Sequence, residues 1–415
     1  MKIFPDGSAM SVKVREMFIA FRNYNYRLWF AGQLVSLVGT WMQTTAQGYL
    51  VYELTHDPAY LGYVAFAGGV AAWLFTLYGG LITDRVPKRI LLMITQSVMM
   101  VLALVLAALV FTKAIQPWMI IVLAFLLGAA NAFDAPARLA FVVEIVSRED
   151  ISNAIALNAS MFNMAIVIGP AVSGLTYDAV GPGWCFLING LTFVAVIISL
   201  FFMRISAAPP RQRQAGSLSE IKEGFNFVIS RKEVIVILVN LALVGMFGIG
   251  LVSLLPAWVN IVLNGGVRDN GYLLSMRGVG SLIAALLMAY LSAKRVKGRL
   301  WSLGSLVLPL AMLVFVFLTD LSYAMAVMVF VGFGYMMVTN SSNALMQDLT
   351  PDDLRGRVMG IYTLVFFGLS PVGSLLMGLV ASWTNEQLAV GASAVILLGL
   401  TLWIRMKVPT MRVLK

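Results

Sequence analysis

The stretch GGLITDRVPKR, residues Gly79 to Arg89, lies between two long apolar runs and carries much of the information about the fold. Its two glycines are followed by four charged residues, Asp84, Arg85, Lys88 and Arg89. A weaker copy, LSAKRVKGR, occupies residues Leu291 to Arg299. Short charged segments between apolar runs are typical of loops that join membrane-spanning helices. The second copy indicates that the chain is internally duplicated.

The composition agrees with a membrane protein. Of the 415 residues, 60% are hydrophobic and only 12% are charged, with a mean hydropathy of +0.89. Soluble domains are about half apolar and one quarter charged. Runs such as Leu91 to Phe111 and Val390 to Ile404 carry no charge and approach the length that crosses a bilayer. We therefore predict an all-α membrane protein with twelve spans, at residues 28–54, 58–83, 88–112, 116–141, 153–178, 184–203, 233–260, 271–292, 299–318, 322–346, 357–383 and 388–405.

The positive charges fall on one side of this predicted topology. Of the 29 Lys and Arg residues, Lys113 and Arg268 fall on the opposite side, and Arg277 falls within a span. Cytoplasmic loops hold the positive charge of membrane proteins, so both termini are expected in the cytoplasm. The net charge of +10 is thus a topology signal and does not indicate a nucleic-acid partner.

Cysteine and histidine are too rare for several kinds of chemistry. Cys185 and His56 are the single residues of their types, which excludes an internal disulfide, a cysteine-based metal cluster and a histidine relay. No phosphate loop of the form GxxxxGK[ST] and no HExxH motif occurs. We expect no metal, no cofactor and no enzymatic activity. The basic N-terminus also lacks the pattern of a removable signal peptide.

The chain divides into two related halves. The polar segment 204–232, with Pro209–Pro210, reads as a cytoplasmic linker with an amphipathic part near Ser219 to Phe227. It separates a first six-helix domain, residues 1–203, from a second, residues 233–415. Gly62 and Gly69 match Gly271 and Gly278 at an offset of 209 residues, and the acidic turns SREDI and TPDDL match at 203. Parallel six-span repeats are typical of transporters with a substrate site at the midplane.

GGLITDRVPKR resembles the loop signature of the major facilitator superfamily, with Pro87 where glycine is usual. RNYNYRLWFAGQLVSLVGTWMQ (Arg22 to Gln43) and NAFDAPAR (Asn131 to Arg138) resemble the branch that contains enterobactin exporters and macrolide-efflux proteins. The resemblance covers nearly the whole chain. It implies two pseudo-symmetric six-helix bundles and transport of a small molecule.

The signature predicts a conformational latch. Gly79 and Gly80 would let a helix of the second half approach closely. Asp84 would then face the N-terminus of the eleventh span near residues 357–360, where the helix dipole favours an anion. Arg85, Lys88 and Arg89 would anchor the loop at lipid headgroups. The alternative is a topology anchor with no latch function.

Acidic residues at span ends are the candidates for proton coupling. Asp134 and Arg138 lie one helical turn apart, and Asp134 is expected to bridge Arg85 or Arg138 in a charge relay, as related exporters suggest. Glu53, at the other end of the first span, is a second candidate and a partner for Arg277. The alternative for Asp134 is a solvated helix end.

The fifth span contains Gly169, Pro170 and Gly174. This segment resembles the Gly-Pro motif of proton-coupled antiporters, with Ser173 in place of one glycine, and the resemblance favours export over import. A packing kink without directional meaning is the alternative.

A polar stripe on the first span predicts a substrate cavity. Gln33, Ser36, Thr40, Gln43 and Gln47 recur at intervals of three and four residues on an apolar helix. Such a face looks toward a cavity or forms hydrogen bonds between helices. Further cavity candidates are Asn131, Asn163, Asn240, Tyr335, Thr339 and Asn343. Arg277, about 9 Å inside its span, would snorkel outward and pair with Glu53 or Asp178.

We therefore predict a monomeric secondary transporter of the bacterial inner membrane. It would be a proton-coupled exporter of a small organic molecule, a siderophore or a hydrophobic drug. An importer or a lipid-type flippase of the same fold, and a membrane receptor that transports nothing, are the alternatives. The expected partners are the substrate, protons and the lipid bilayer.

Overall fold

The computed structural model describes residues 18–204, 218–291 and 296–412, and this part of the chain consists of helices joined by loops, with no strand. Its first six long helices are α2 (Tyr24–Thr55), α3 (Pro58–Arg85), α4 (Lys88–Phe111), α5 (Pro117–Glu144), α6 (Ile151–Val180) and α7 (Pro182–Phe202). The second six are α9 (Lys232–Ile261), α10 (Val267–Leu291), α11 (Lys297–Val316), α12 (Leu321–Leu349), α13 (Arg355–Trp383) and α14 (Glu386–Lys407). The shorter elements are η1 (Ile19–Arg22), η2 (Arg148–Asp150), α8 (Leu218–Ser230) and η3 (Pro409–Arg412).

The predicted spans correspond to these twelve helices, and their ends agree within about four residues. Local signals set the ends. Asp57 caps α3 by accepting a hydrogen bond from the Ala59 amide at 2.9 Å, and Pro58 occupies the first turn. Gly181, with a positive φ of 92°, ends α6 and Pro182 begins α7. The all-α membrane fold predicted from the sequence is confirmed.

Eleven of the helices in the described part of the chain are long and apolar enough to cross a membrane. Helix α2 is not among them because its glutamines and threonines lower its hydropathy, although it has 32 residues. It packs along α6 and α7 inside the first bundle, where its polar side chains are shielded from lipid. The prediction of α2 as a span follows from its length and position rather than from hydropathy.

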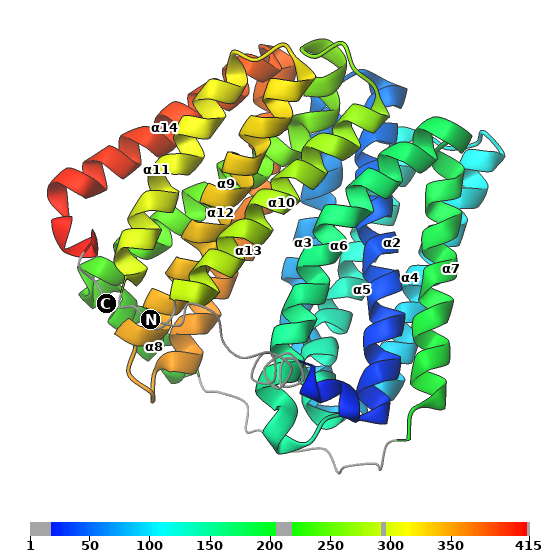
Figure 1. Ribbon diagram of the computed structural model, residues 1–415, viewed down its shortest axis with the longest axis horizontal. Coiled ribbons are helices and arrows are strands. Elements are labelled where there is room, and N and C mark those ends of the chain that lie inside the picture. The colour runs from blue at the N-terminus through cyan, green and yellow to red at the C-terminus, as the bar shows by residue number, and fades with distance from the viewer. Residues whose placement is uncertain (1–17, 205–217, 292–295, 413–415) are drawn as a thin grey trace, which may run out of the picture.

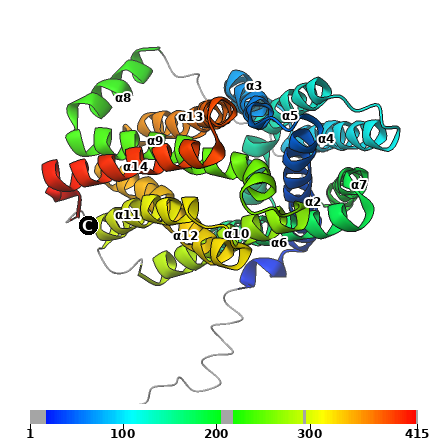
Figure 2. The ribbon, with the colours of Figure 1, turned by 90° about the horizontal axis from the view of Figure 1, so that it is seen from above.

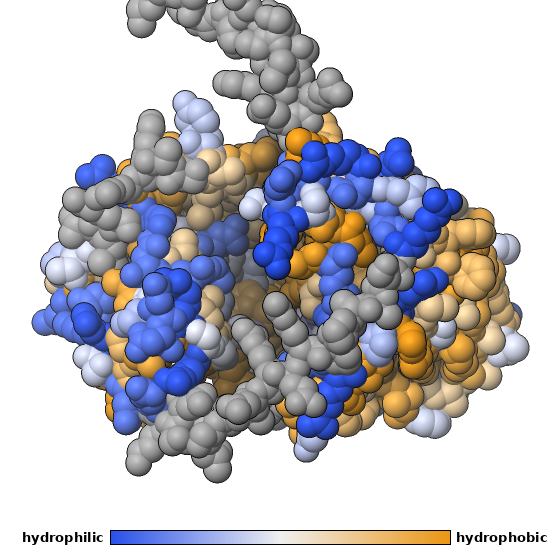
Figure 3. Space-filling model, turned by 90° about the horizontal axis from the view of Figure 1, so that it is seen from below, coloured by the Kyte–Doolittle hydropathy of each residue, from blue (hydrophilic) through white to orange (hydrophobic). Residues whose placement is uncertain are grey.

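Two groups of helices make up the molecule, α2–α7 and α9–α14, and they diverge toward one end (Figure 1). We call the end with α8 and the α3–α4 loop the linker side, and the opposite end the far side. Seen from the far side, α3 lies beside α13 and α6 lies beside α10, so these two helix pairs join the groups (Figure 2). A hollow opens between the groups on the linker side (Figure 3).

The two joining pairs meet at equivalent glycines. A Cβ atom on Gly378 of α13 would lie 3.1 Å from the Cα of Gly62 in α3. In the other pair, a Cβ atom on Gly271 of α10 would lie 3.1 Å from the Cα of Gly174 in α6. Gly62 and Gly271 are the residues that the internal repeat matched. The duplication has therefore placed the same close helix crossing on both sides of the molecule.

Candidate transport pathway

The two glycines of the loop signature lie in different environments. A Cβ atom on Gly79 would lie 2.1 Å from the Ala132 carbonyl oxygen of α5, so Gly79 permits packing inside the first bundle. Gly80 has no atom within 4 Å of such a Cβ position. The expectation that both glycines contact the second half is thus wrong for Gly79 in this conformation, and Gly80 lies beside open space.

Asp84 and Arg85 are exposed at the linker side. Within the described residues, neither side chain has a hydrogen-bond or ion-pair partner. At the N-terminus of α13, Arg357 pairs with Glu223 of α8 at 2.5 Å. The contact predicted between Asp84 and this helix end is therefore absent from this conformation. Residues 292–295, at the centre of the second, weaker copy, lie outside the described residues.

The two basic residues after the loop bind other helices of the first bundle. Lys88 donates to Glu144 of α5 at 2.5 Å. Arg89 donates to the Phe201 carbonyl oxygen of α7 at 2.8 Å. These contacts tie the start of α4 to two neighbours, and headgroup anchoring by Arg85, Lys88 and Arg89 stays a prediction.

Asp134 lies in the interior of the first bundle, where its side chain is 1% exposed. Its carboxylate accepts hydrogen bonds of 2.9 Å from the Thr95 hydroxyl and the Gln96 amide of α4. Arg138, one turn away on α5, approaches it at 3.6 Å. The pair with Arg138 is present, whereas the relay through Arg85 and the solvated helix end are both contradicted. Thr95 and Gln96 were not singled out in the sequence, although they interrupt the apolar run of α4.

At the far side, the acids bind partners other than Arg277. Glu53 of α2 accepts a hydrogen bond from the Tyr177 hydroxyl of α6. Asp178 forms an ion pair with Arg268 of α10, which joins the two bundles at this end. The predicted pairing of Arg277 with Glu53 or Asp178 is therefore wrong. The Asp178–Arg268 pair closes the far side beside the glycine crossing of α6 and α10.

Arg277 lies deeper than predicted. Helix α10 begins at Val267, four residues before the predicted start, so Arg277 lies about 15 Å from the far-side end at 1.5 Å per residue. This depth is close to the middle of the membrane and excludes snorkelling to the far-side surface. The guanidinium carbon lies 5.5 Å from the centre of the Tyr335 ring of α12. The two predicted cavity residues are thus in contact.

The polar stripe of α2 faces the interior of the first bundle. Gln33, Gln43 and Gln47 are at most 5% exposed. The Gln43 side-chain oxygen accepts a 2.7 Å hydrogen bond from Asn189 of α7. Gln43 therefore forms an interhelical hydrogen bond, which was the alternative given in the sequence analysis. The prediction that Gln43 lies on a cavity face is wrong for this structure. Thr40 is half-buried at the edge of the stripe.

Some of the remaining cavity candidates are buried and hydrogen-bonded inside a bundle, and others are half-buried. Asn240 of α9 is buried and donates to the Ser305 hydroxyl at 2.9 Å inside the second bundle, so it does not line a cavity here. Thr339 is also buried and donates to the Tyr335 carbonyl oxygen at 3.1 Å. Asn131 donates to the Leu127 carbonyl oxygen of its own helix at 3.1 Å. Asn163 is half-buried, as is Asn343, whose side-chain oxygen accepts a bond from Gln347 at 2.6 Å.

The Gly-Pro segment packs where α6 meets helices of both bundles. Helix α6 continues through Pro170 to Val180. A Cβ atom on Gly169 would lie 2.5 Å from the Cβ of Trp41 in α2. A Cβ atom on Gly271 of α10 would lie 2.5 Å from the Pro170 carbonyl oxygen. The segment therefore allows three helices to approach closely at the junction between the bundles.

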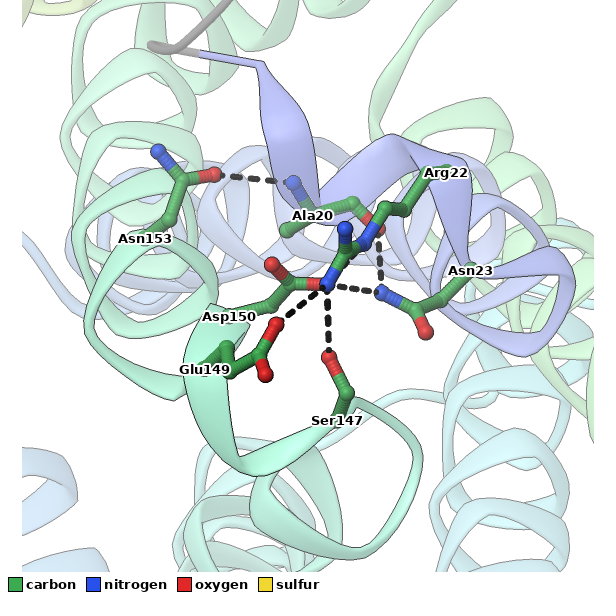
Figure 4. Close-up of polar contacts among 7 residues, drawn as sticks. All are labelled: Ala20, Arg22, Asn23, Ser147, Glu149, Asp150 and Asn153. Carbon is green, nitrogen blue, oxygen red and sulfur yellow. Dashed lines mark hydrogen bonds and ion pairs between the residues drawn. The ribbon is translucent and has the colours of Figure 1, made fainter.

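A polar network at the linker side joins the segments that precede α2 and α6 (Figure 4). Arg22 of η1 donates to Asp150 of η2 at 2.7 Å, and Asn23 and Ser147 donate to the same carboxylate at 2.8 Å. Hydrogen bonds from Arg22 to Asp150 and Glu149, with the charge of Asp150, raise the pKa of the guanidinium. The acidic turn SREDI marked this place in the sequence, but its partner Arg22 was not predicted.

The chain matches a family described as transmembrane secretion effector over residues 16–415. It belongs to this family of the major facilitator superfamily. The chain is therefore a membrane transporter and not an enzyme. Within the described residues, no three His, Cys, Asp or Glu side chains gather as metal ligands.

Characterised relatives cover most of the chain. A staphyloferrin A transporter of Staphylococcus aureus is 24% identical over 86% of this chain and 89% of the relative. The multidrug efflux pump Tap of Mycolicibacterium fortuitum is 27% identical over 76% of this chain and 79% of its own length. The enterobactin exporter EntS of Shigella boydii is 24% identical over 85% and 84%.

Solved structures share the fold at low sequence identity. A POT family transporter in complex with 5-aminolevulinic acid aligns with a TM-score of 0.75 at 11% identity, over 94% of this chain and 97% of that one. The nucleoside transporter NupG aligns with a TM-score of 0.71 at 12% identity, over 94% and 99%. These likenesses concern the arrangement of helices.

Proposed function

We propose that this protein exports a small organic molecule from the cytoplasm by alternating access, and that the structure represents its cytoplasm-open state. The excess of Lys and Arg on the linker side supports a cytoplasmic linker side. The relatives named for staphyloferrin A, enterobactin and multidrug efflux support a siderophore or a hydrophobic drug as substrate. The bacterial inner membrane is the site that this function requires.

The observation that carries the proposal is the incomplete contact between α3 and α13. At the far side, Gly62 faces Leu375; nearer the middle, Gly69 faces Pro371 and Trp73 faces Gly368. Gly80 lies two turns beyond Trp73 on the same face of α3, and Asp84 lies one turn further. A Cβ atom on Gly80 would have no atom within 4 Å, and Asp84 has no hydrogen-bond or ion-pair partner among the described residues. The helices are thus joined at the far side and separated at the linker side.

Closure of the linker side would extend this contact. In an antiparallel pair, eleven residues beyond Gly69 on α3 correspond to eleven residues before Pro371 on α13. Gly80 would then meet Gly360, which also has no atom within 4 Å of a Cβ position. Asp84 would meet Arg357 at the N-terminus of α13, where both the guanidinium and the helix dipole favour an anion. In the open state Glu223 of α8 holds Arg357 instead.

Proton coupling is assigned in this proposal to Asp134. Its carboxylate is buried within the first bundle and bound by Thr95, Gln96 and Arg138, so a change in its protonation alters contacts between α4 and α5. Helix α5 packs against α3, which carries Asp84. A proton on Asp134 is thereby linked to the position of the latch helix.

The test is transport into inverted membrane vesicles that contain the protein. Staphyloferrin A, enterobactin and a panel of hydrophobic drugs are offered, and accumulation is measured with and without a proton gradient. We expect gradient-dependent accumulation of at least one compound relative to vesicles that lack the protein. Accumulation of none, or uptake only in right-side-out vesicles, would overturn the proposed export.

A further inference from the structure

Arg277 is a positive charge near the middle of the membrane for which the described residues provide no acidic partner. The acids nearest in the topology are engaged elsewhere, since Glu53 binds Tyr177, Asp178 binds Arg268, and Asp269 accepts a bond from the Gly266 amide. A charged side chain within a membrane is costly and is usually paired or functional. Arginine also stays protonated at every physiological pH. Arg277 is therefore a permanent positive charge that an anion would stabilise.

An aromatic side chain of the second bundle lies beside this charge, and further rings pack next to it. The Tyr335 ring lies 5.5 Å from the Arg277 guanidinium carbon. Phe366 of α13 lies 6.5 Å from Tyr335 and 6.4 Å from the stacked ring of Tyr362. A Cβ atom on Gly248 of α9 would lie 3.0 Å from the Tyr335 ring, so this glycine leaves room for the ring. Tyr335 of α12 and Phe366 and Tyr362 of α13 thus form a row of aromatic rings that begins beside the Arg277 guanidinium.

The first bundle contributes a polar group about one helical turn from this level. A Cβ atom on Gly278, the residue after Arg277, would lie 3.0 Å from the Val167 side chain of α6. Asn163 lies one turn from Val167 on the same face of α6 and is half-buried. Within the described residues its amide has no hydrogen-bond partner. An amide at this place can donate to an anion that Arg277 attracts.

We propose that Arg277 binds a carboxylate of an organic anion and that Tyr335 and Phe366 contact the apolar body of the same molecule. This inference rests on the proposed transport function and names its substrate class. The planar guanidinium matches a carboxylate with two parallel hydrogen bonds. One guanidinium neutralises one carboxylate, whereas a phosphate dianion would leave an unpaired negative charge between apolar walls. The site therefore selects singly charged organic acids with an aromatic or aliphatic body.

Matched pairs of compounds test this class directly. Benzoate, 2-naphthoate and hexanoate are each compared with the uncharged amide of the same skeleton. Binding to the purified full-length protein is followed by quenching of tryptophan fluorescence, and uptake is followed in inverted vesicles. The variants are Arg277→Gln, which removes the charge, and Arg277→Lys, which keeps the charge without the planar fork. Arg231→Gln is the matched control, because Arg231 also lies over an aromatic ring, Phe227 at 5.8 Å, but is exposed outside the membrane spans.

We expect the wild type and Arg231→Gln to bind at least one acid about tenfold more tightly than its amide, the scale of one charge-assisted contact. In Arg277→Gln this ratio falls to about one while amide binding is unchanged, and Arg277→Lys lies between them. An equal preference for acid and amide in the wild type, or a preserved ratio in Arg277→Gln, would overturn the site. If Arg277→Gln does not fold, an Arg277→Lys ratio equal to that of the wild type overturns it. Binding with these ratios but without vesicle uptake would instead contradict the export proposal.

Discussion

Asp84 has an exposed carboxylate without a partner here, although the register of α3 and α13 places Arg357 opposite it after closure. We expect Asp84→Asn to fold normally and to reduce transport several-fold. Loss of the attraction to the helix N-terminus, worth roughly 0.3–2 kcal/mol, would shift the population toward the open state. Transport per molecule in vesicles is the measurement, with Asp352→Asn, another exposed linker-side acid, as the control. A normal transport rate in Asp84→Asn would contradict the proposed latch.

Asp134 is the acid whose protonation the account couples to transport. In proteoliposomes, substrate is expected to release protons with the wild type and to release few or none with Asp134→Asn. The asparagine keeps an acceptor for Thr95 and Gln96 but loses the pair with Arg138, so the fold is expected to survive. Glu53→Gln serves as the comparison, because Glu53 binds only Tyr177 among the described residues. Equal proton release by Asp134→Asn and the wild type would exclude Asp134 as the coupling group.

Some residue contacts were accessible to sequence reasoning and others were not. The spacing of four between Asp134 and Arg138 predicts contact on one helix, and the charge distribution isolates Arg277 within a span. The partners of Glu53, Gln43 and Asn240 lie on other helices, and a single sequence does not specify how helices rotate against one another. A polar stripe looks the same whether it faces a cavity or the interior of its own bundle.

Among the elements, the crossing of α6 and α10 depends on close backbone contact. We expect Gly271→Val to reduce transport about tenfold or more, since its Cβ would lie 2.5 Å from the Pro170 carbonyl oxygen and overpacking costs about 1–3 kcal/mol. Gly399→Val of α14 is the matched control, because no atom lies within 4 Å of its Cβ position. Vesicle transport at equal protein level distinguishes them. Similar rates in the two variants would show that the crossing does not limit the motion.

Helix α2 gives a test of which face borders the hollow. Thr44 is exposed, and Gly48, one turn away, faces Pro256 of the second bundle. In a Cys185→Ser background, a cysteine at position 44 is expected to react with a small hydrophilic thiol reagent much faster than one at position 43. The Gln43 side is closed by Asn189. Faster reaction at position 43 would restore the polar stripe as the cavity face.

The boundaries of the elements were predictable because capping residues, prolines and glycines act locally. The starts of α2 and α10 show the largest differences, four residues each, and at α10 Val267 and Asp269 precede the strongly apolar run. That shift of four residues moved Arg277 from a shallow place to the middle of the membrane. The amphipathic part of the linker corresponds to α8, but its contact with α13 through Glu223 depends on tertiary structure.

For the whole molecule, the internal repeat and the charge distribution were enough to predict the fold and a topology. The conformation was not predictable, because a transporter sequence encodes more than one arrangement of its two bundles. Which pairs separate depends on small differences in free energy between these arrangements. The open linker side and the closed far side therefore come from the structure alone.

Alternating access is tested most directly by a disulfide cross-link between Gly80→Cys and Gly360→Cys in the Cys185→Ser background. The account predicts that oxidation joins the two cysteines in membranes, that the joined protein does not transport, and that a reductant restores its activity. The pair Gly80→Cys and Gly399→Cys, whose helices α3 and α14 do not pack along each other, should remain unlinked. Failure of the first pair to join, or a normal transport rate in the joined protein, would contradict closure of the linker side through α3 and α13.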